Sequence, residues 1–127
     1  MDKKLPQIAD AEWVIMMVLW KNSPLLNKDI IKSVSENRSW NNKTIETLLR
    51  RLVEKGAVGY NQINSKMREY FPLISQEECI RIESESFLKK VYNGSVSTFM
   101  EGLIKNKKVS KEELQKLKEL INFDEEE

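Results

Sequence analysis

The chain has 127 residues, of which 40% are hydrophobic and 32% charged, and its net charge is +1. This composition predicts a folded, helix-rich protein of one domain or two small ones. Histidine is absent and Cys79 is the single cysteine, which excludes an internal disulfide and the usual zinc and copper sites. The same cysteine usage indicates a reducing compartment such as the cytoplasm, and the apolar stretch 11–20 is too short to span a bilayer.

Charge is distributed unevenly along the chain. Residues 1–74 contain 12 Lys and Arg against 8 Asp and Glu, a net charge of +4, whereas residues 75–127 contain 9 against 12, a net charge of −3. This difference suggests two tasks, with anion binding in the first part. Acidic pairs at 77–78 and 112–113 fall in the first turns of expected helices, where they interact favourably with the helix dipole. With no glycine-rich phosphate loop and no catalytic constellation, we expect neither an enzyme nor a cofactor.

Two helices are expected before residue 40. The first spans about 11–21 with Asp10 as its cap, and its core side carries Trp13, Met16, Met17 and Trp20. The second spans about 28–36 with Asn27 as its cap, and its inward side carries Ile30, Ile31 and Val34. A break at residues 24–25, with room for a short extended segment, separates the two helices.

The stretch WNNKTIETLLRRLVEKG, residues 40–56, predicts a third helix with two different faces. At about 100° per residue, one narrow arc collects the apolar residues Ile45, Leu48, Leu49 and Leu52. The rest of the surface is polar and carries Lys43, Thr44, Glu46, Thr47, Arg50, Arg51 and Glu54. Asn41 can cap the first turn and Gly56 ends the helix. Such a polar face usually means only contact with solvent, and this helix alone leaves that alternative open.

A β-hairpin is expected directly after the third helix. The stretches AVGYNQ and MREYFPL are short and rich in β-branched and aromatic residues, and the turn between them contains Asn64 and Ser65. Lys66 and Arg68 lie at or near the tip, and Pro72 ends the second strand as an edge-strand proline can. Helix, turn, capped helix and basic hairpin follow one another in the order of a winged helix. We therefore expect a winged helix-turn-helix domain in residues 1–74.

The remaining residues, 75–127, predict three amphipathic helices and an acidic, frayed end at 124–127. The helices begin after Ser75, Ser95 and Ser110, the last within a capping box. Three helices of this size make a thin core, so they either fold back on the first part or pair with a second chain. We favour pairing into a homodimer, because winged helices commonly bind DNA as dimers. The residues expected to contribute are Phe87, Val91, Phe99, Met100, Leu103, Leu114, Leu117 and Leu120.

Cys79 falls within the first of these three helices. A free cysteine most often behaves as a small buried hydrophobic residue, and a redox role is the less favoured alternative.

Four stretches carry a family resemblance: AEWVIMMVLW, WNNKTIETLLRRLVEKG, YFPLISQEE and FLKKVYNGS. With them the chain resembles, over nearly its whole length, the penicillinase-repressor family, the BlaI/MecI type of winged-helix transcriptional repressor. The resemblance implies a homodimer with an N-terminal DNA-binding domain and a C-terminal helical dimerisation domain. It also implies repression of a promoter, relieved when a membrane sensor protease triggers cleavage of the repressor.

Three features differ from the family pattern in ways that matter for function. Glu46 stands where some members of the family carry a basic or neutral residue, which implies a different operator preference. The bond that the family cleaves, often Asn-Phe, aligns with Gly102-Leu103 in this chain. The copper-responsive branch of the family ends in a cysteine cluster, and this chain has no cysteine after Cys79. The resemblance therefore argues against a copper sensor and does not by itself imply a response to β-lactams.

Ten residues are candidates for DNA contact: Asn27, Asn41, Lys43, Thr44, Glu46, Thr47, Arg50, Arg51, Lys66 and Arg68. Lysine and arginine can bind phosphates or guanine, and short threonines let a helix backbone approach the floor of the groove. Glutamate can accept from a cytosine amine or repel a nearby phosphate, and helix starts at Asn27 and Asn41 offer backbone N–H groups to phosphates. A winged helix used only for protein–protein contact is the rival interpretation.

Overall fold

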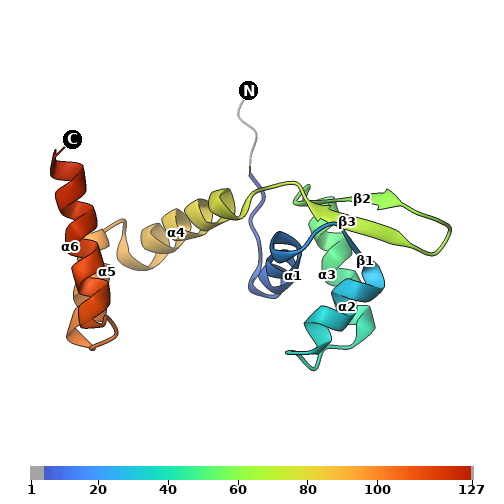
Figure 1. Cartoon of the computed structure of the whole chain (residues 1–127), viewed down its shortest axis with the longest axis horizontal. Helices are drawn as coiled ribbons and strands as arrows, with labels where there is room; N and C mark the ends of the chain where they lie inside the picture. The colour runs from blue at the N-terminus through green and yellow to red at the C-terminus, as the bar shows by residue number, and fades with distance from the viewer. Residues whose placement is uncertain (1–4, 127) are drawn as a thin grey trace. The chain divides into compact units, whose positions relative to one another are not determined.

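The computed structural model describes residues 5–126, with side chains described through residue 123. This part of the chain is mostly helical and contains six helices and one small antiparallel sheet (Figure 1). The elements in chain order are α1 (Asp10–Lys21), β1 (Leu25–Leu26), α2 (Asn27–Ser35), α3 (Asn42–Glu54), β2 (Val58–Gln62), β3 (Arg68–Pro72), α4 (Gln76–Tyr92), α5 (Val96–Lys105) and α6 (Lys111–Glu126). The predicted fold class, mainly helical with a hairpin wing, is confirmed.

The helix caps agree with the sequence in the second half of the winged helix but not in the first. Asn41 caps α3 as predicted, since its Oδ1 accepts from the backbone N–H of Thr44 at 2.8 Å. The predictions that Asp10 and Asn27 act as caps are wrong, because both are the first residues inside their helices. At α1 the Glu12 carboxylate accepts from the backbone N–H of Ala9 at 2.9 Å, which satisfies the chain at the helix start.

Asn27 follows β1 directly, and this explains why it does not act as a cap. Leu25 and Leu26 pair with β3, so the chain passes from strand to helix without an intervening residue and Leu26 occupies the cap position. The break expected at residues 24–25 therefore contains a short strand, which adds a third member to the hairpin sheet.

The sheet has the order β1-β3-β2, with both neighbouring pairs antiparallel. Tyr60 lies opposite Tyr70, and Gln62 lies opposite Arg68 in the pair next to the turn of the hairpin. Asn64 organises the tip, because its Oδ1 accepts from the backbone N–H groups of Lys66 and Met67 at 2.9 and 3.0 Å. Pro72 closes β3 opposite Val58, beyond the part of β3 that pairs with β1, so its missing N–H interrupts no β1 contact.

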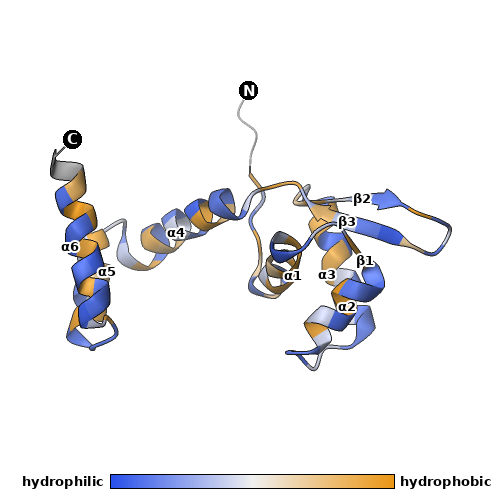
Figure 2. Cartoon of the chain, in the orientation of Figure 1, coloured by the Kyte–Doolittle hydropathy of each residue, from blue (hydrophilic) through white to orange (hydrophobic). Residues whose placement is uncertain are grey.

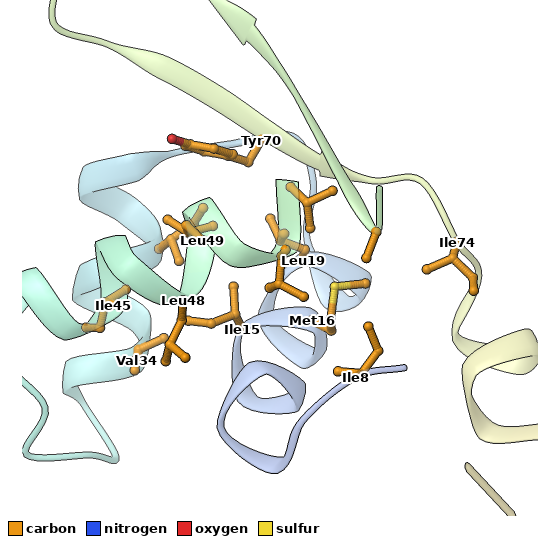
Figure 3. Close-up of a cluster of buried hydrophobic side chains, with 14 of the residues drawn as sticks. Ile8, Ile15, Met16, Leu19, Val34, Ile45, Leu48, Leu49, Tyr70 and Ile74 are labelled. Carbon is orange, nitrogen blue, oxygen red and sulfur yellow. The ribbon is translucent and has the colours of Figure 1, made fainter. Parts of the chain in front are cut away.

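The hydrophobic core lies among α1, α2, α3, the sheet and the start of α4 (Figure 3). Its fully buried members include Ile15, Met16, Leu19, Ile30, Ile45, Leu49 and Leu52. The predicted inward face of α3 is confirmed, because Ile45, Leu48, Leu49 and Leu52 are all buried. The prediction for Met17 is wrong: it is 45% exposed, since the buried arc of α1 runs through Ile15 and Leu19 instead.

The start of α4 belongs to this core. Cys79 is 2% exposed, and burial, with a smaller effect of Glu78, raises the pKa of its thiol above the ordinary value. The indole N–H of Trp20 donates to the carbonyl of Ile74 at 3.0 Å, which ties the chain leaving the sheet to α1. Cys79 therefore packs as a small hydrophobic residue, as expected.

Contacts divide the chain into two compact units, residues 1–83 and 84–127, with the division inside α4. In residues 84–123 no side chain is buried, and the closest packing is a cluster of Phe87, Tyr92 and Phe99 with ring centroids 5.1–5.8 Å apart. Hydrophobic residues remain on the surface of α5 and α6 (Figure 2). The acidic end expected to be frayed is helical to Glu126, and Glu127 lies outside the described residues.

No helix in the described part of the chain is long and apolar enough to cross a membrane.

Candidate nucleic-acid interface

The outer face of α3 is exposed and polar over its whole length. Its exposed members are Lys43, Thr44, Glu46, Arg50 and Arg51, and Thr47 is half-buried. Because the four buried residues of α3 are fixed in the core, this face is held rigidly toward solvent. The helix begins just after Asn41, so the face starts at a helix N-terminus that favours anions.

Two side chains on this face are already engaged within the helix. The Thr47 hydroxyl donates to the Lys43 carbonyl at 2.9 Å, an i−4 bond that uses its only proton. Thr47 can therefore offer a methyl group and oxygen lone pairs to a base, but not an O–H donor in this arrangement. Arg50 lies 3.9 Å from the Glu54 carboxylate, an exposed pair that contributes little to stability and leaves Arg50 available.

A groove of about 400 Å³ separates α3 from the wing formed by β2, β3 and their turn. It brings together five of the ten predicted DNA-contact residues: Asn27, Glu46, Arg50, Lys66 and Arg68. The other five, Asn41, Lys43, Thr44, Thr47 and Arg51, do not line this groove. The candidate interface thus consists of the outer face of α3 and the adjoining groove.

The groove also contains residues that the sequence analysis missed, namely Tyr60, Gln62, Ser65 and Tyr70. The guanidinium carbon of Arg68 lies 4.2 Å from the ring centroid of Tyr60, and its Nε donates to Gln62 Oε1 at 2.8 Å. Strand alternation could have predicted Tyr60, Gln62 and Tyr70, because side chains two apart on a strand share a face and meet their cross-strand neighbours. Ser65 lies in the turn, where this signal is absent.

A larger hollow of about 1030 Å³ lies along α1 and α2, with Trp13, Met17, Lys32 and Arg38 among its lining residues. None of the predicted site residues lines it, and its charges are of both signs.

In the part of the chain that the structure describes, no cluster of three or more His, Cys, Asp or Glu could hold a metal ion.

The arrangement of α2, the tight turn 36–41, α3 and the β2–β3 hairpin defines a winged helix-turn-helix protein. In this class the second helix of the motif enters the major groove of DNA.

Comparison with known proteins identifies the family. The family model described as penicillinase repressor matches residues 8–123. The penicillinase repressor of Bacillus licheniformis is 36% identical over 94% of this chain and 92% of its own length, and the methicillin resistance regulatory protein MecI of Staphylococcus aureus is 29% identical over 96% and 98%. The chain therefore belongs to the penicillinase repressor family.

Two solved structures each resemble 61% of the chain. The DNA-binding domain of the repressor BlaI matches with a TM-score of 0.54 and 39% identity over 61% of this chain and 93% of that one. The monomeric form of Bacillus licheniformis BlaI, solved in complex with the blaP half-operator, matches with a TM-score of 0.52 and 39% identity over the same shares.

Proposed function

We propose that this chain is a sequence-specific DNA-binding transcriptional repressor that acts as a homodimer on an inverted-repeat operator. The observation that carries the proposal is the rigid polar face of α3 beside the groove to the wing. Membership of a repressor family and the half-operator complex of the related BlaI support it. On this proposal the chain is not an enzyme, and its DNA target places it in the cytoplasm.

In the proposed complex α3 lies in the major groove. Lys43, Arg50 and Arg51 bind phosphates or guanine, and a bidentate arginine–guanine pair contributes about 1–3 kcal/mol of discrimination. The threonine methyls meet thymine methyls, and Glu46 accepts from a cytosine amine or tunes affinity by repelling phosphate. Asn27, Lys66 and Arg68 flank the groove beside α3, where they contact the DNA backbone.

The second part of the chain, about residues 75–127, supplies the dimer contacts in this proposal. Of its apolar side chains Phe87, Val91, Ile104 and Leu120 are 42–65% exposed in the single chain, which is the surface that a partner helix would cover. The other candidate contacts, Phe99, Met100, Leu103, Leu114 and Leu117, are only half-buried. A second copy would complete the core that one copy lacks.

Release from DNA is proposed to follow cleavage in α5, at or near Gly102-Leu103, under the control of a membrane sensor protease. The Gly102 carbonyl accepts from the backbone N–H and the side-chain amide of Asn106, at 3.1 and 2.8 Å. Because proteases act on extended backbone, this helical bond becomes accessible only when α5 opens locally. Cleavage there would remove Leu103, Ile104 and all of α6 from the dimer contacts.

A winged helix that binds only proteins is the alternative function. This alternative predicts that binding is insensitive to salt and that no DNA sequence is selected. A DNA-binding protein neutralises several phosphates, so its affinity for DNA falls steeply as the salt concentration rises. The groove beside α3 is lined by three cations, Arg50, Lys66 and Arg68, against two carboxylates, Glu46 and Glu54, and this excess of positive charge favours DNA.

Selection of bound duplexes from random DNA with the full chain tests the proposal. We expect enrichment of an inverted repeat whose half-sites are about one helical turn apart, or a multiple of it. No enrichment over the starting pool would overturn the proposed function, and enrichment of isolated half-sites would overturn its dimeric form.

A further inference from the structure

We propose that Tyr60 and Gln62 are positioning residues that hold the Arg68 guanidinium ready to bind a phosphate of the DNA backbone in the groove between α3 and the wing. The proposal rests on the proposed function and assigns a task to two residues that the sequence analysis did not select. Neither residue needs to touch DNA, because both act through Arg68.

The register of the hairpin brings the three side chains together. Gln62 lies directly opposite Arg68, and Tyr60 is two residues from Gln62 on the same strand, so all three share one face of the sheet. Tyr70 lies on that face too, with its ring centroid 6.0 Å from that of Tyr60. All four residues line the groove beside α3.

Two different contacts orient the guanidinium. The face of Tyr60 attracts the cation, with the guanidinium carbon 4.2 Å from the ring centroid, and Gln62 accepts a hydrogen bond from Nε at 2.8 Å. In the described part of the chain the two terminal nitrogens of Arg68 make no hydrogen bond or ion pair. These nitrogens form a fork that matches two oxygens of one phosphate.

The acidic neighbour of Arg68 does not compete for it. Glu69 is the next residue of β3, so its side chain is on the opposite face of the sheet, and its carboxylate accepts from the Asn61 amide at 3.1 Å. Arg50 and Lys66 line the same groove together with Glu46 and Glu54, and of these carboxylates Glu54 lies near Arg50, at 3.9 Å. The positive charge of Arg68 therefore remains available.

The contacts at Arg68 add little to the stability of the fold. Tyr60 is 40% exposed, and Gln62 and Arg68 are exposed as well. A flexible arginine loses rotamer freedom when it binds, and holding it beforehand lowers that cost. The expected benefit is in DNA affinity, by about two- to fivefold for an exposed cation–π contact.

A double-mutant cycle on the full chain tests this inference with a scrambled duplex as the probe, measured over a series of salt concentrations. We expect Arg68→Ala to weaken binding and to reduce the slope of log affinity against log salt by about one unit. Tyr60→Leu should weaken binding about two- to fivefold when Arg68 is present and have no effect in the Arg68→Ala background. Gln62→Ala should likewise weaken binding only when Arg68 is present. Tyr60→Phe keeps the aromatic ring, so it should bind the duplex with the affinity of the unchanged chain.

Equal effects of Tyr60→Leu in both backgrounds, or an unchanged salt slope for Arg68→Ala, would overturn the inference. A loss seen only on a selected operator and not on the scrambled duplex would also overturn it, because it would mean that Arg68 reads a base. If the unchanged chain binds no duplex even at low salt, the proposed function fails as well. If it binds but the cycle shows no coupling, only the positioning role fails.

Discussion

The Lys55 ammonium at the end of α3 donates to the Glu12 carboxylate of α1, which is 2% exposed. Lys55 also donates to the Gln7 carbonyl at 3.0 Å, and Glu12 accepts from the Ala9 N–H. The C-terminal end of the proposed recognition helix is therefore fixed both to α1 and to the chain that precedes it. This ion pair sets the position of the helix end from which the wing begins.

Removing Lys55 should destabilise the winged helix. Lys55→Ala leaves the Glu12 charge buried without its cation, and we expect a loss of about 1–3 kcal/mol in the free energy of unfolding. The loss falls short of that for a fully buried pair because the Lys55 side chain is 35% exposed. Urea denaturation measures it, with Lys28→Ala on the exposed side of α2 as the control. The double mutant Glu12→Gln/Lys55→Ala should regain stability, because it removes the unpaired buried charge. A double mutant no more stable than Lys55→Ala would contradict this explanation.

The dimer contacts are best tested at Leu120 rather than at Phe99. Phe99 packs within its own chain against Phe87 and Tyr92, so a charge there would disturb the fold of the unit itself. Leu120 is 65% exposed, and Leu120→Asp should raise the dimer dissociation constant by at least about tenfold, because a buried charge has no partner at the interface. Sedimentation equilibrium measures this, with Gln115→Asp on the same helix as the control. A monomer for the unchanged chain at micromolar concentration would rule out the dimer.

A chain that ends at Gly102 should bind the operator weakly. It keeps the whole core of the winged helix but lacks α6 and the end of α5, which we propose hold the dimer together. Two separate monomers must then bind the two half-sites independently, so the affinity for the operator should be about a hundredfold lower than that of the full chain. Titration of the same operator with both chains provides the measurement. A truncated chain that dimerises and binds as tightly as the full one would exclude release by cleavage.

Substitution by alanine should raise stability at Gly102 and lower it at Gly59. A methyl group at Gly102 would meet nothing within 4 Å, so Gly102→Ala should stabilise α5 by about 0.5–1 kcal/mol and slow cleavage there about two- to fivefold. A methyl group at Gly59 would lie 2.8 Å from the Phe71 ring, so Gly59→Ala should destabilise the sheet by about 1–3 kcal/mol. Thermal unfolding and limited proteolysis check the pair, and faster cleavage of Gly102→Ala would contradict the role of local opening.

The third helix was predictable because several signals agreed. The apolar spacing from Ile45 to Leu52, the Asn41 cap and the Gly56 stop all describe the same element, and Gly56 has the positive φ of 81° that favours glycine. The hairpin was predictable for the same reason. In contrast, the caps at Asp10 and Asn27 were wrong, for a different reason at each helix.

At α1 the contact that satisfies the helix start is local, because Glu12 accepts from the N–H of Ala9, three residues before it. At α2 a contact distant in sequence decides, because the pairing of β1 with β3 sets the start of the helix, and sequence periodicity cannot show such a pairing. Strand alternation could have indicated that Tyr60 and Arg68 share a face of the hairpin. Predicting their contact also required the pairing register of the two strands, which the length of the turn alone did not determine.

The most direct test of DNA reading by α3 compares affinities for a selected operator and a scrambled duplex. Arg51→Ala and Thr47→Ala should weaken operator binding, by about five- to a hundredfold for Arg51, and change scrambled binding much less. Lys66→Ala is the matched control, and it should weaken both duplexes alike and lower the salt slope by about one unit. Quantitative gel shifts give all eight affinities. Equal losses on both duplexes for all three variants would contradict the assignment of α3 as the recognition helix.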